Sequence, residues 1–185
     1  MSVKIKLAFY KENKSIVDKG IAWWTNGPYS HVELLIDKRT AFGTDDELER
    51  IVNDTISEYR QRGLSKKMCH FKDKYVQFSS LINYGGVRIK TCNLNNDVCD
   101  YLNIEVDDIK IIIDFYKLIL NQKYDLLGIL GFIIPIQDRT NRWFCSETTT
   151  NALKICGLKE LWLLEPSTIS PNKLYNLLKN YHYAK

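Results

Sequence analysis

Hydrophobic and polar residues alternate along several short segments of this chain, and a period of two is typical of strands with one buried face. The alternation is found in residues 3–9, 31–36, 75–80, 87–90 and part of 98–106. Turn-forming residues separate these segments, and residues 41–43 would begin a return strand after the polar turn at 37–40. Short strands joined by turns predict an antiparallel sheet.

Other segments repeat their hydrophobic residues every three or four positions, which predicts amphipathic helices. The clearest begins at Asp107, and its apolar stripe consists of Ile109, Ile112, Ile113, Tyr116, Ile119 and Leu120. Further helices are predicted at 16–24, at 126–132, from Cys145 to Gly157, and from Pro171 to Leu178. Together the two patterns predict an α+β fold, a single domain in which an antiparallel sheet packs against helices.

A charged segment at 44–74 separates the second predicted strand from the third. Thr44 and Glu47 have the spacing of a capping box, in which two side chains bond the free backbone groups of a helix start. The apolar residues that follow share one helical face, and they are Leu48, Ile51, Val52, Ile56 and Tyr59. We therefore expect a helical insertion at 44–74.

The chain has 185 residues, of which 45% are hydrophobic, enough for one domain spanning 1–185. Its net charge of +4 is spread along the sequence without a basic block, which argues against a nucleic-acid partner. The longest apolar run, 126–136, is too short for a transmembrane segment, although transient contact with a membrane surface stays open. The first residues lack the continuous apolar core of a signal peptide, which favours a cytoplasmic location.

The motifs of the common cofactor and metal sites are missing from the sequence. The five cysteines are odd in number and show no CxxC spacing, as expected for a reducing intracellular setting. There is no P-loop, HExxH motif or dinucleotide fingerprint. We therefore expect no cofactor and no metal, and the oligomeric state stays open.

Cys145 is the strongest candidate for chemistry in this sequence. It follows the short segment 142–144 and begins a predicted helix, where free backbone N–H groups and the helix dipole favour a thiolate. His31 lies far upstream, at the start of an apolar strand. A thiol nucleophile and a histidine base on separate elements are what a thiol hydrolase needs, although each residue could instead be structural.

Other residues near these two could support the chemistry. Ser146 and Glu147 follow the cysteine, and backbone N–H groups at this helix start could form part of an oxyanion hole. Glu147 could equally well serve only to satisfy the helix dipole. Three tryptophans flank the candidate elements and could line an apolar substrate cleft or simply pack in the core: Trp23, Trp24 and Trp143.

Four blocks of the sequence, taken in order, resemble the circularly permuted branch of the NlpC/P60 papain-like cysteine hydrolases. The blocks are 23–25 with 29–34, then 85–88, then 124–131, and finally 142–147 followed by Pro166 and 169–174. This branch includes YiiX-like proteins, lecithin:retinol acyltransferase-like proteins, and related phage and poxvirus proteins. The resemblance implies a papain-like fold in which the histidine precedes the cysteine, with Cys145 as nucleophile and His31 as base.

The residue that would orient the imidazole is less clear. In this family a polar residue on the strand beside the histidine strand has that role, and the glutamate often seen there in YiiX-like proteins has no clean counterpart here. Gln77 and Ser79 share one face of the predicted 75–80 strand, and Ser80 lies on the other. Glu33, two residues after His31, shares a face with the histidine and is a fourth candidate.

The resemblance implies a thiol hydrolase or acyltransferase, which cleaves an amide, peptide, ester or thioester bond through a cysteinyl acyl-enzyme. Its substrate would be a peptide or a lipid ester, and its location would be the host cytoplasm if the protein is viral. The alternative is a catalytically inactive member of the fold that acts as a binding or virion-associated protein.

Overall fold

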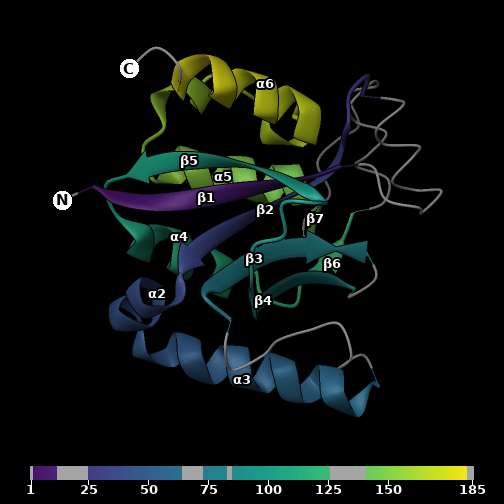
Figure 1. Ribbon diagram of the computed structural model, residues 1–185, viewed down its shortest axis with the longest axis vertical. Coiled ribbons are helices and arrows are strands. Elements are labelled where there is room, and N and C mark those ends of the chain that lie inside the picture. The colour runs from purple at the N-terminus through teal and green to yellow at the C-terminus, as the bar shows by residue number, and fades with distance from the viewer. Residues whose placement is uncertain (1, 12–24, 64–72, 83–84, 126–140, 183–185) are drawn as a thin grey trace.

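The computed structural model describes residues 2–11, 25–63, 73–82, 85–125 and 141–182 (Figure 1). Seven strands within these residues form one sheet of order β5-β1-β2-β3-β4-β6-β7. The strands are β1 (Val3–Lys11), β2 (Tyr29–Asp37), β3 (Tyr75–Leu81), β4 (Gly86–Cys92), β5 (Cys99–Val106), β6 (Lys123–Tyr124) and β7 (Arg142–Trp143). Neighbouring strands are antiparallel, except that β6 and β7 are parallel.

Helices cover one face and both ends of this sheet. In the described part of the chain they are α2 (Lys38–Thr44), α3 (Asp46–Gln61), α4 (Ile109–Leu118), α5 (Cys145–Ile155) and α6 (Pro171–His182), with 3₁₀ turns η4 (Lys159–Leu161) and η5 (Pro166–Thr168). Figure 1 shows α4 and α5 behind the sheet, α6 at the end near β5, and α3 at the other end below β4. The predicted α+β class is therefore confirmed. The helices predicted at 16–24 and 126–132 lie outside the described residues.

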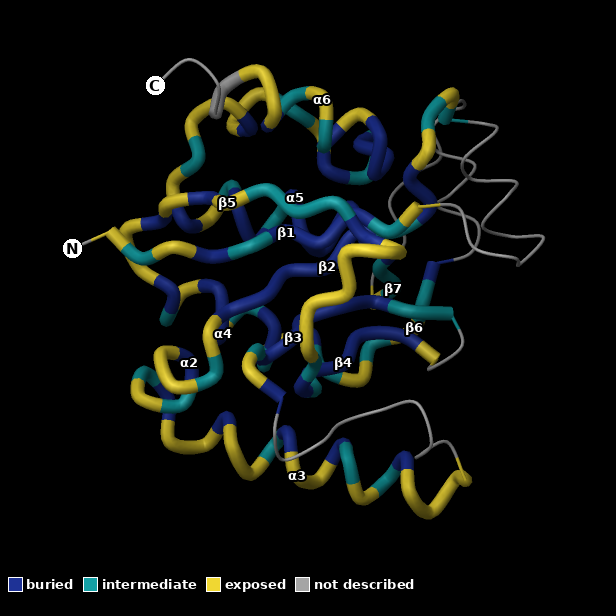
Figure 2. The backbone as a smooth tube through the Cα atoms, viewed as in Figure 1, coloured by how far each residue is buried: buried dark blue, intermediate teal, exposed yellow. Residues whose placement is uncertain are grey.

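The main hydrophobic core lies between the sheet and its helices. Alternate residues of β2, Val32, Leu34 and Ile36, point into this core, where Ile112 of α4 and Leu153 of α5 meet them. Figure 2 shows the central strands as the most deeply buried part of the chain. This packing explains why the period-two alternation located the strands correctly.

The opposite face of the sheet has a smaller core. Ala8, Leu35 and Cys99 are buried there, with Tyr10 and Tyr101 packed against them at its margin. The exposed connection 93–98 joins β4 to β5, and the backbone N–H of Asn95 donates a hydrogen bond of 2.7 Å to the Tyr101 hydroxyl. The side chains on this second face are therefore partly enclosed without a covering helix among the described residues.

The prediction of a return strand at 41–43 is wrong. The Asp37 carboxylate accepts hydrogen bonds of 3.1 Å from the backbone N–H groups of Arg39 and Thr40, and these bonds start helix α2. Ala41 is buried in the main core from this helix. A side-chain cap of this kind outweighs an alternation of only three residues.

The segment predicted as a helical insertion at 44–74 contains a helix, and its residues 64–72 lie outside the described part of the chain. Its helix runs from Asp46 to Gln61 and buries Leu48, Val52 and Tyr59, as the apolar stripe predicted. The capping residue is Asp45 rather than Thr44, because the Asp45 carboxylate accepts from the N–H groups of Glu47 and Leu48 at 3.0 and 3.2 Å. Thr44 instead ends α2.

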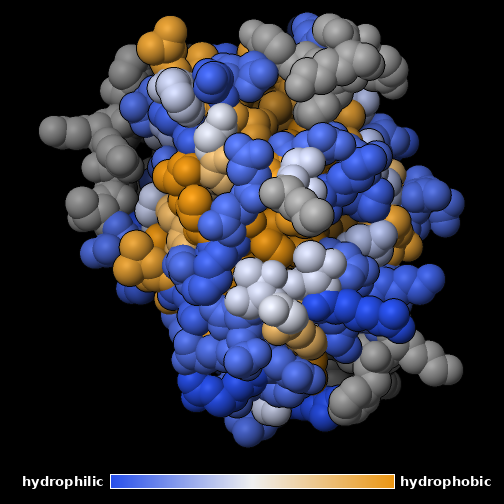
Figure 3. Space-filling model, turned by 90° about the vertical axis from the view of Figure 1, so that its left-hand side faces the viewer, coloured by the Kyte–Doolittle hydropathy of each residue, from blue (hydrophilic) through white to orange (hydrophobic). Residues whose placement is uncertain are grey.

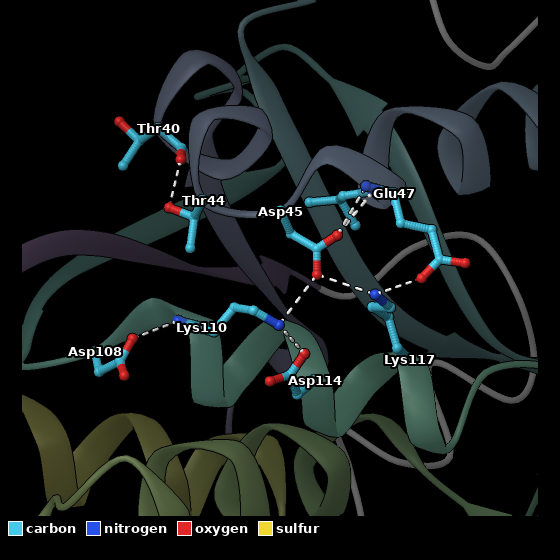
Figure 4. A network of polar contacts seen from close by, with 9 residues as sticks. Thr40, Thr44, Asp45, Glu47, Asp108, Lys110, Asp114 and Lys117 are labelled. Carbon is cyan, nitrogen blue, oxygen red and sulfur yellow. Dashed lines mark hydrogen bonds and ion pairs between the residues drawn. The ribbon is translucent and has the colours of Figure 1, made fainter.

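Ion pairs attach α3 to α4 (Figure 4). Asp45 Oδ2 lies 3.3 Å from Lys110 Nζ and 3.0 Å from Lys117 Nζ. Lys117 Nζ also lies 2.7 Å from Glu47 Oε2, and Lys110 pairs with Asp114. These contacts fix the start of α3 at the surface while its apolar face packs on the core.

Candidate functional site

An irregularity in β2 determines the position of His31. Tyr10 pairs with His31 and Lys11 pairs with Tyr29, so Ser30 is an extra residue on β2. A bulge of this kind changes the direction of the side chain that follows it and is frequent beside active sites. The described pairing of β2 with β3 begins at Leu34, so the segment that contains His31 is free of β3.

Cys145 is the first residue of α5, as predicted, and β7 leads directly into it. The carbonyl of Trp143 accepts a hydrogen bond of 2.7 Å from Ser80 Oγ and one of 3.2 Å from the N–H of Asp125. Helix α5 packs against both β2 and β3, and the Cys145 side chain is buried at the edge of the main core. The cysteine is therefore held against the strand that carries His31.

His31 contacts both Cys145 and Glu33. Its Nε2 lies 3.1 Å from Glu33 Oε1, and the two side chains are only 11% and 2% exposed. The Cys145 thiol lies close enough to the imidazole to raise the pKa of His31. The structure thus brings together the predicted nucleophile, the predicted base and one of the four candidates for the third residue.

The electrostatics of the site favour a charged histidine. Burial on its own would lower the pKa of His31, because an imidazolium loses its hydration there. The charge of Cys145 and its hydrogen bond, followed by those of Glu33, outweigh burial and raise the pKa of His31 to about 10. For Glu33 burial works in the opposite direction, but His31 and then Lys90 lower the pKa of this carboxyl. Both shifts favour the charged forms, an imidazolium on His31 and a carboxylate on Glu33.

The other three candidates for the third residue do not contact the imidazole. Gln77 donates a long hydrogen bond of 3.4 Å to the hydroxyl of Tyr10. Ser80 faces the core side and bonds the Trp143 carbonyl. Ser79 is buried, and its hydroxyl has no hydrogen-bond partner in the described part of the chain.

Tyr10 also belongs to this site, although no pattern in the sequence pointed to it. Its ring centroid lies 5.4 Å from that of His31, on the neighbouring strand. Burial and the charge of Glu33 raise the pKa of Tyr10, so its hydroxyl stays protonated. The alternation in 3–9 indicated a strand, but the register that sets Tyr10 opposite His31 depends on pairing between two distant segments.

The residues around Cys145 have mixed roles. Glu147 Oε2 accepts a hydrogen bond of 3.3 Å from the backbone N–H of Phe144, which caps the helix. Ser146 is fully buried. The N–H groups of the first turn of α5 have no acceptor within the helix, because four such groups are left over at every helix start.

Trp143, the third tryptophan proposed for a cleft, packs beside the site. Its indole N–H donates to the side-chain carbonyl of Gln122, and its ring meets Phe115 edge-on with centroids 5.8 Å apart. It also contacts the main core. Trp23 and Trp24 lie outside the described residues.

Within the described ranges, no three His, Cys, Asp or Glu side chains are grouped so that they could hold a metal ion. Nor does any helix in that same part of the chain have the length and apolar character needed to cross a membrane. Comparison of the sequence with models of known protein families and with curated proteins finds no match. The functional inference therefore depends on the geometry of Cys145, His31 and Glu33.

Proposed function

We propose that this protein is a thiol hydrolase or acyltransferase that cleaves an amide, peptide, ester or thioester bond through Cys145. The observation that supports this most directly is the contact of a helix-start cysteine with a histidine that is itself bound to a buried carboxylate. A cysteine hydrolase needs a nucleophile, a group that carries its proton, and a third group that orients the proton carrier. The resemblance of the sequence blocks to the permuted NlpC/P60 hydrolases supports the same assignment.

In the proposed reaction the Cys145 thiolate attacks the carbonyl carbon of the substrate and forms a C–S bond. Backbone N–H groups of the first turn of α5 stabilise the oxyanion. The bond to the leaving group then breaks, and the leaving group takes the proton of the His31 imidazolium. Water or another acceptor next gives a proton to His31 and attacks the thioester, which releases the acyl group and restores the thiolate.

Glu33 has the orienting role in this scheme. It bonds Nε2 of His31, which leaves Nδ1 as the ring nitrogen that would exchange a proton with the thiol. The charge of Glu33 also raises the pKa of His31, so it favours the imidazolium that protonates the leaving group. The third residue then comes from the histidine strand itself rather than from the strand beside it.

The test is alkylation of the full-length protein by iodoacetamide at about pH 6, followed by peptide mass spectrometry. Cys99 and Cys156 are internal controls, because both are buried like Cys145 and burial raises the pKa of each to about 11. We expect Cys145 to be labelled first, and His31→Ala to slow its labelling by at least about tenfold.

Two results would contradict the proposal. Cys145 might label no faster than Cys99, or His31→Ala might leave the labelling rate of Cys145 unchanged. Either result favours the alternative of an inactive protein that binds a partner through this fold. After a positive result, incubation with activated peptide esters and lipid thioesters, with the mass of the Cys145 peptide as readout, identifies the acyl group that is transferred.

A further inference from the structure

A row of buried polar residues crosses the sheet face that carries His31. Ser79 of β3 pairs with Arg88 of β4. The described pairing of β2 with β3 ends at Leu34 and Phe78, and Glu33 and Ser79 are the next residues on the two strands. Val87 and Phe78 point into the main core, so Ser79 and Arg88 lie on the opposite face, together with Glu33.

Two members of this row have a buried polar atom without a hydrogen-bond partner among the described residues. These atoms are Ser79 Oγ and Arg88 Nε. Ser79 is 1% exposed and Arg88 is 8% exposed. An unpaired group of this kind costs about 1–3 kcal/mol, so two such groups on neighbouring strands lower the stability of the fold considerably. A ligand that supplies the missing partners explains why they are kept.

The guanidinium of Arg88 is held in place at the end of the sheet where His31 lies. Its Nη1 donates a hydrogen bond of 2.7 Å to the backbone carbonyl of Val87. Its Nη2 lies 4.0 Å from the point that a Cβ on Gly85 would occupy, beside the turn that precedes β4. One group of the guanidinium is thus held by the backbone, and the buried Nε–H has no acceptor among the described residues.

The charges on this face favour an anionic ligand. Arg88 and Lys90 are both on the outer face of β4, and Lys90 is close enough to lower the pKa of Glu33. The carboxylate of Glu33 is already paired with the His31 imidazolium. Tyr10 and Gln77, which also face this side, are neutral. An anion would therefore bind at the Ser79–Arg88 side of the row, away from Glu33.

We propose that Arg88 and Ser79 form a subsite for an anionic group, a carboxylate or a phosphate, on the substrate that Cys145 attacks. Side chains of a cross-strand pair are about 5 Å apart at Cβ, so the Arg88 N–H and the Ser79 O–H can donate to one anion. Arg88 and Glu33 are two strands apart, about 10 Å, so the anionic group is several bonds from the scissile carbonyl. This inference rests on the proposed function and narrows its substrate to a charged amide or ester.

The experiment measures binding without chemistry, in the full-length Cys145→Ala protein. Inorganic phosphate and glutarate are titrated separately at constant ionic strength, and NMR shifts of backbone amides give the Kd of each. We expect saturable binding of at least one, and the tighter anion identifies the class of the substrate group. Combining Cys145→Ala with Ser79→Ala or with Arg88→Lys should raise the Kd of the bound anion by at least about fivefold, because each substitution removes one oriented donor.

Ser80→Ala is the matched control, because Ser80 is equally buried but faces the core and bonds the Trp143 carbonyl. It should leave the Kd unchanged. Absence of saturable binding, or a Kd insensitive to both Ser79→Ala and Arg88→Lys, would overturn the proposed subsite. Neither result depends on the reactivity of Cys145, so failure of the subsite is distinguishable from failure of the hydrolase proposal.

Discussion

Two polar clusters of this protein differ in how completely their members are paired. In the cluster between α3 and α4, Asp45 bonds two backbone N–H groups and two lysines, and each lysine has a second carboxylate partner (Figure 4). On the sheet face, Ser79 Oγ and Arg88 Nε are buried and have no hydrogen-bond partner among the described residues. Figure 3 shows from the side how hydrophilic side chains cover much of the surface around α3.

The difference separates the functions of the two clusters. The lysines between α3 and α4 are partly exposed, with Lys110 at 43% and Lys117 at 23%, so water screens these ion pairs and each contributes little. The buried groups on the sheet face are removed from water, so leaving them without a partner lowers the stability of the fold. We infer that the paired cluster fixes α3 on the fold, whereas the unpaired row is kept for a ligand.

The largest effect is expected from breaking the buried His31–Glu33 pair. Glu33→Ala should lower the free energy of unfolding by about 3 kcal/mol, because it leaves a buried imidazolium without its partner. Glu33→Gln keeps the shape and a hydrogen bond and should cost clearly less. Urea denaturation at neutral pH measures both. Equal losses for the two variants would show that the charge of Glu33 does not stabilise the fold.

A second effect is expected at alkaline pH. The folded-state pKa of His31 is raised to about 10. Its ordinary value is about 6.5, so its stabilising contribution is complete below that pH and is lost as the pH rises towards 10. Denaturation of the wild type and of His31→Gln at neutral pH and near pH 10 measures this contribution.

The comparison with His31→Gln is needed because other groups also reduce the stability of the fold as the pH rises. The pKa values of Cys99 and Cys156 are raised to about 11, and both thiols weaken the fold at high pH. Their contribution is present in both proteins and cancels. If the wild type and His31→Gln lose the same stability, the imidazolium is not stabilised in the folded protein.

A smaller effect is expected from Asp45, at the centre of the paired cluster. Asp45→Ala removes the cap of α3 and should cost about 1–2 kcal/mol. Asp45→Asn keeps the capping oxygen and removes the charge, so its cost should stay below about 1 kcal/mol. Thermal denaturation compares the two variants. If Asp45→Asn were as damaging as Asp45→Ala, the ion pairs with the lysines would dominate over the cap.

Much of the fold could be predicted from the sequence because local patterns determine it. The alternation in 3–9 and 75–80 reflects strands with one face in the main core, and the stripe from Ile109 reflects a helix on that core. The wrong prediction of a strand at 41–43 also has a local cause. Asp37 caps a helix there, and three residues are too few for the period to decide between a strand and a helix.

The site could be predicted only in part. The position of Cys145 at a helix start follows from its own neighbours in the sequence, and the prediction is confirmed. The contact of Glu33 with His31, by contrast, depends on the bulge at Ser30, and that of Tyr10 depends on the pairing of β1 with β2. Registers between distant strands are set by the whole sheet, so a single sequence does not reveal them.

The smallest effects are expected from two adjacent serines that the strand directs to opposite faces. Ser80 donates a hydrogen bond of 2.7 Å to the Trp143 carbonyl, so Ser80→Ala should cost about 1 kcal/mol. Ser79 is just as buried but has no described partner, so Ser79→Ala removes an unpaired hydroxyl and should leave stability unchanged or raise it by up to about 1 kcal/mol. Urea denaturation of both variants without added anion makes the comparison. A clear loss from Ser79→Ala would mean that its hydroxyl already has a partner in the free protein, and the reason for assigning it to a ligand would disappear.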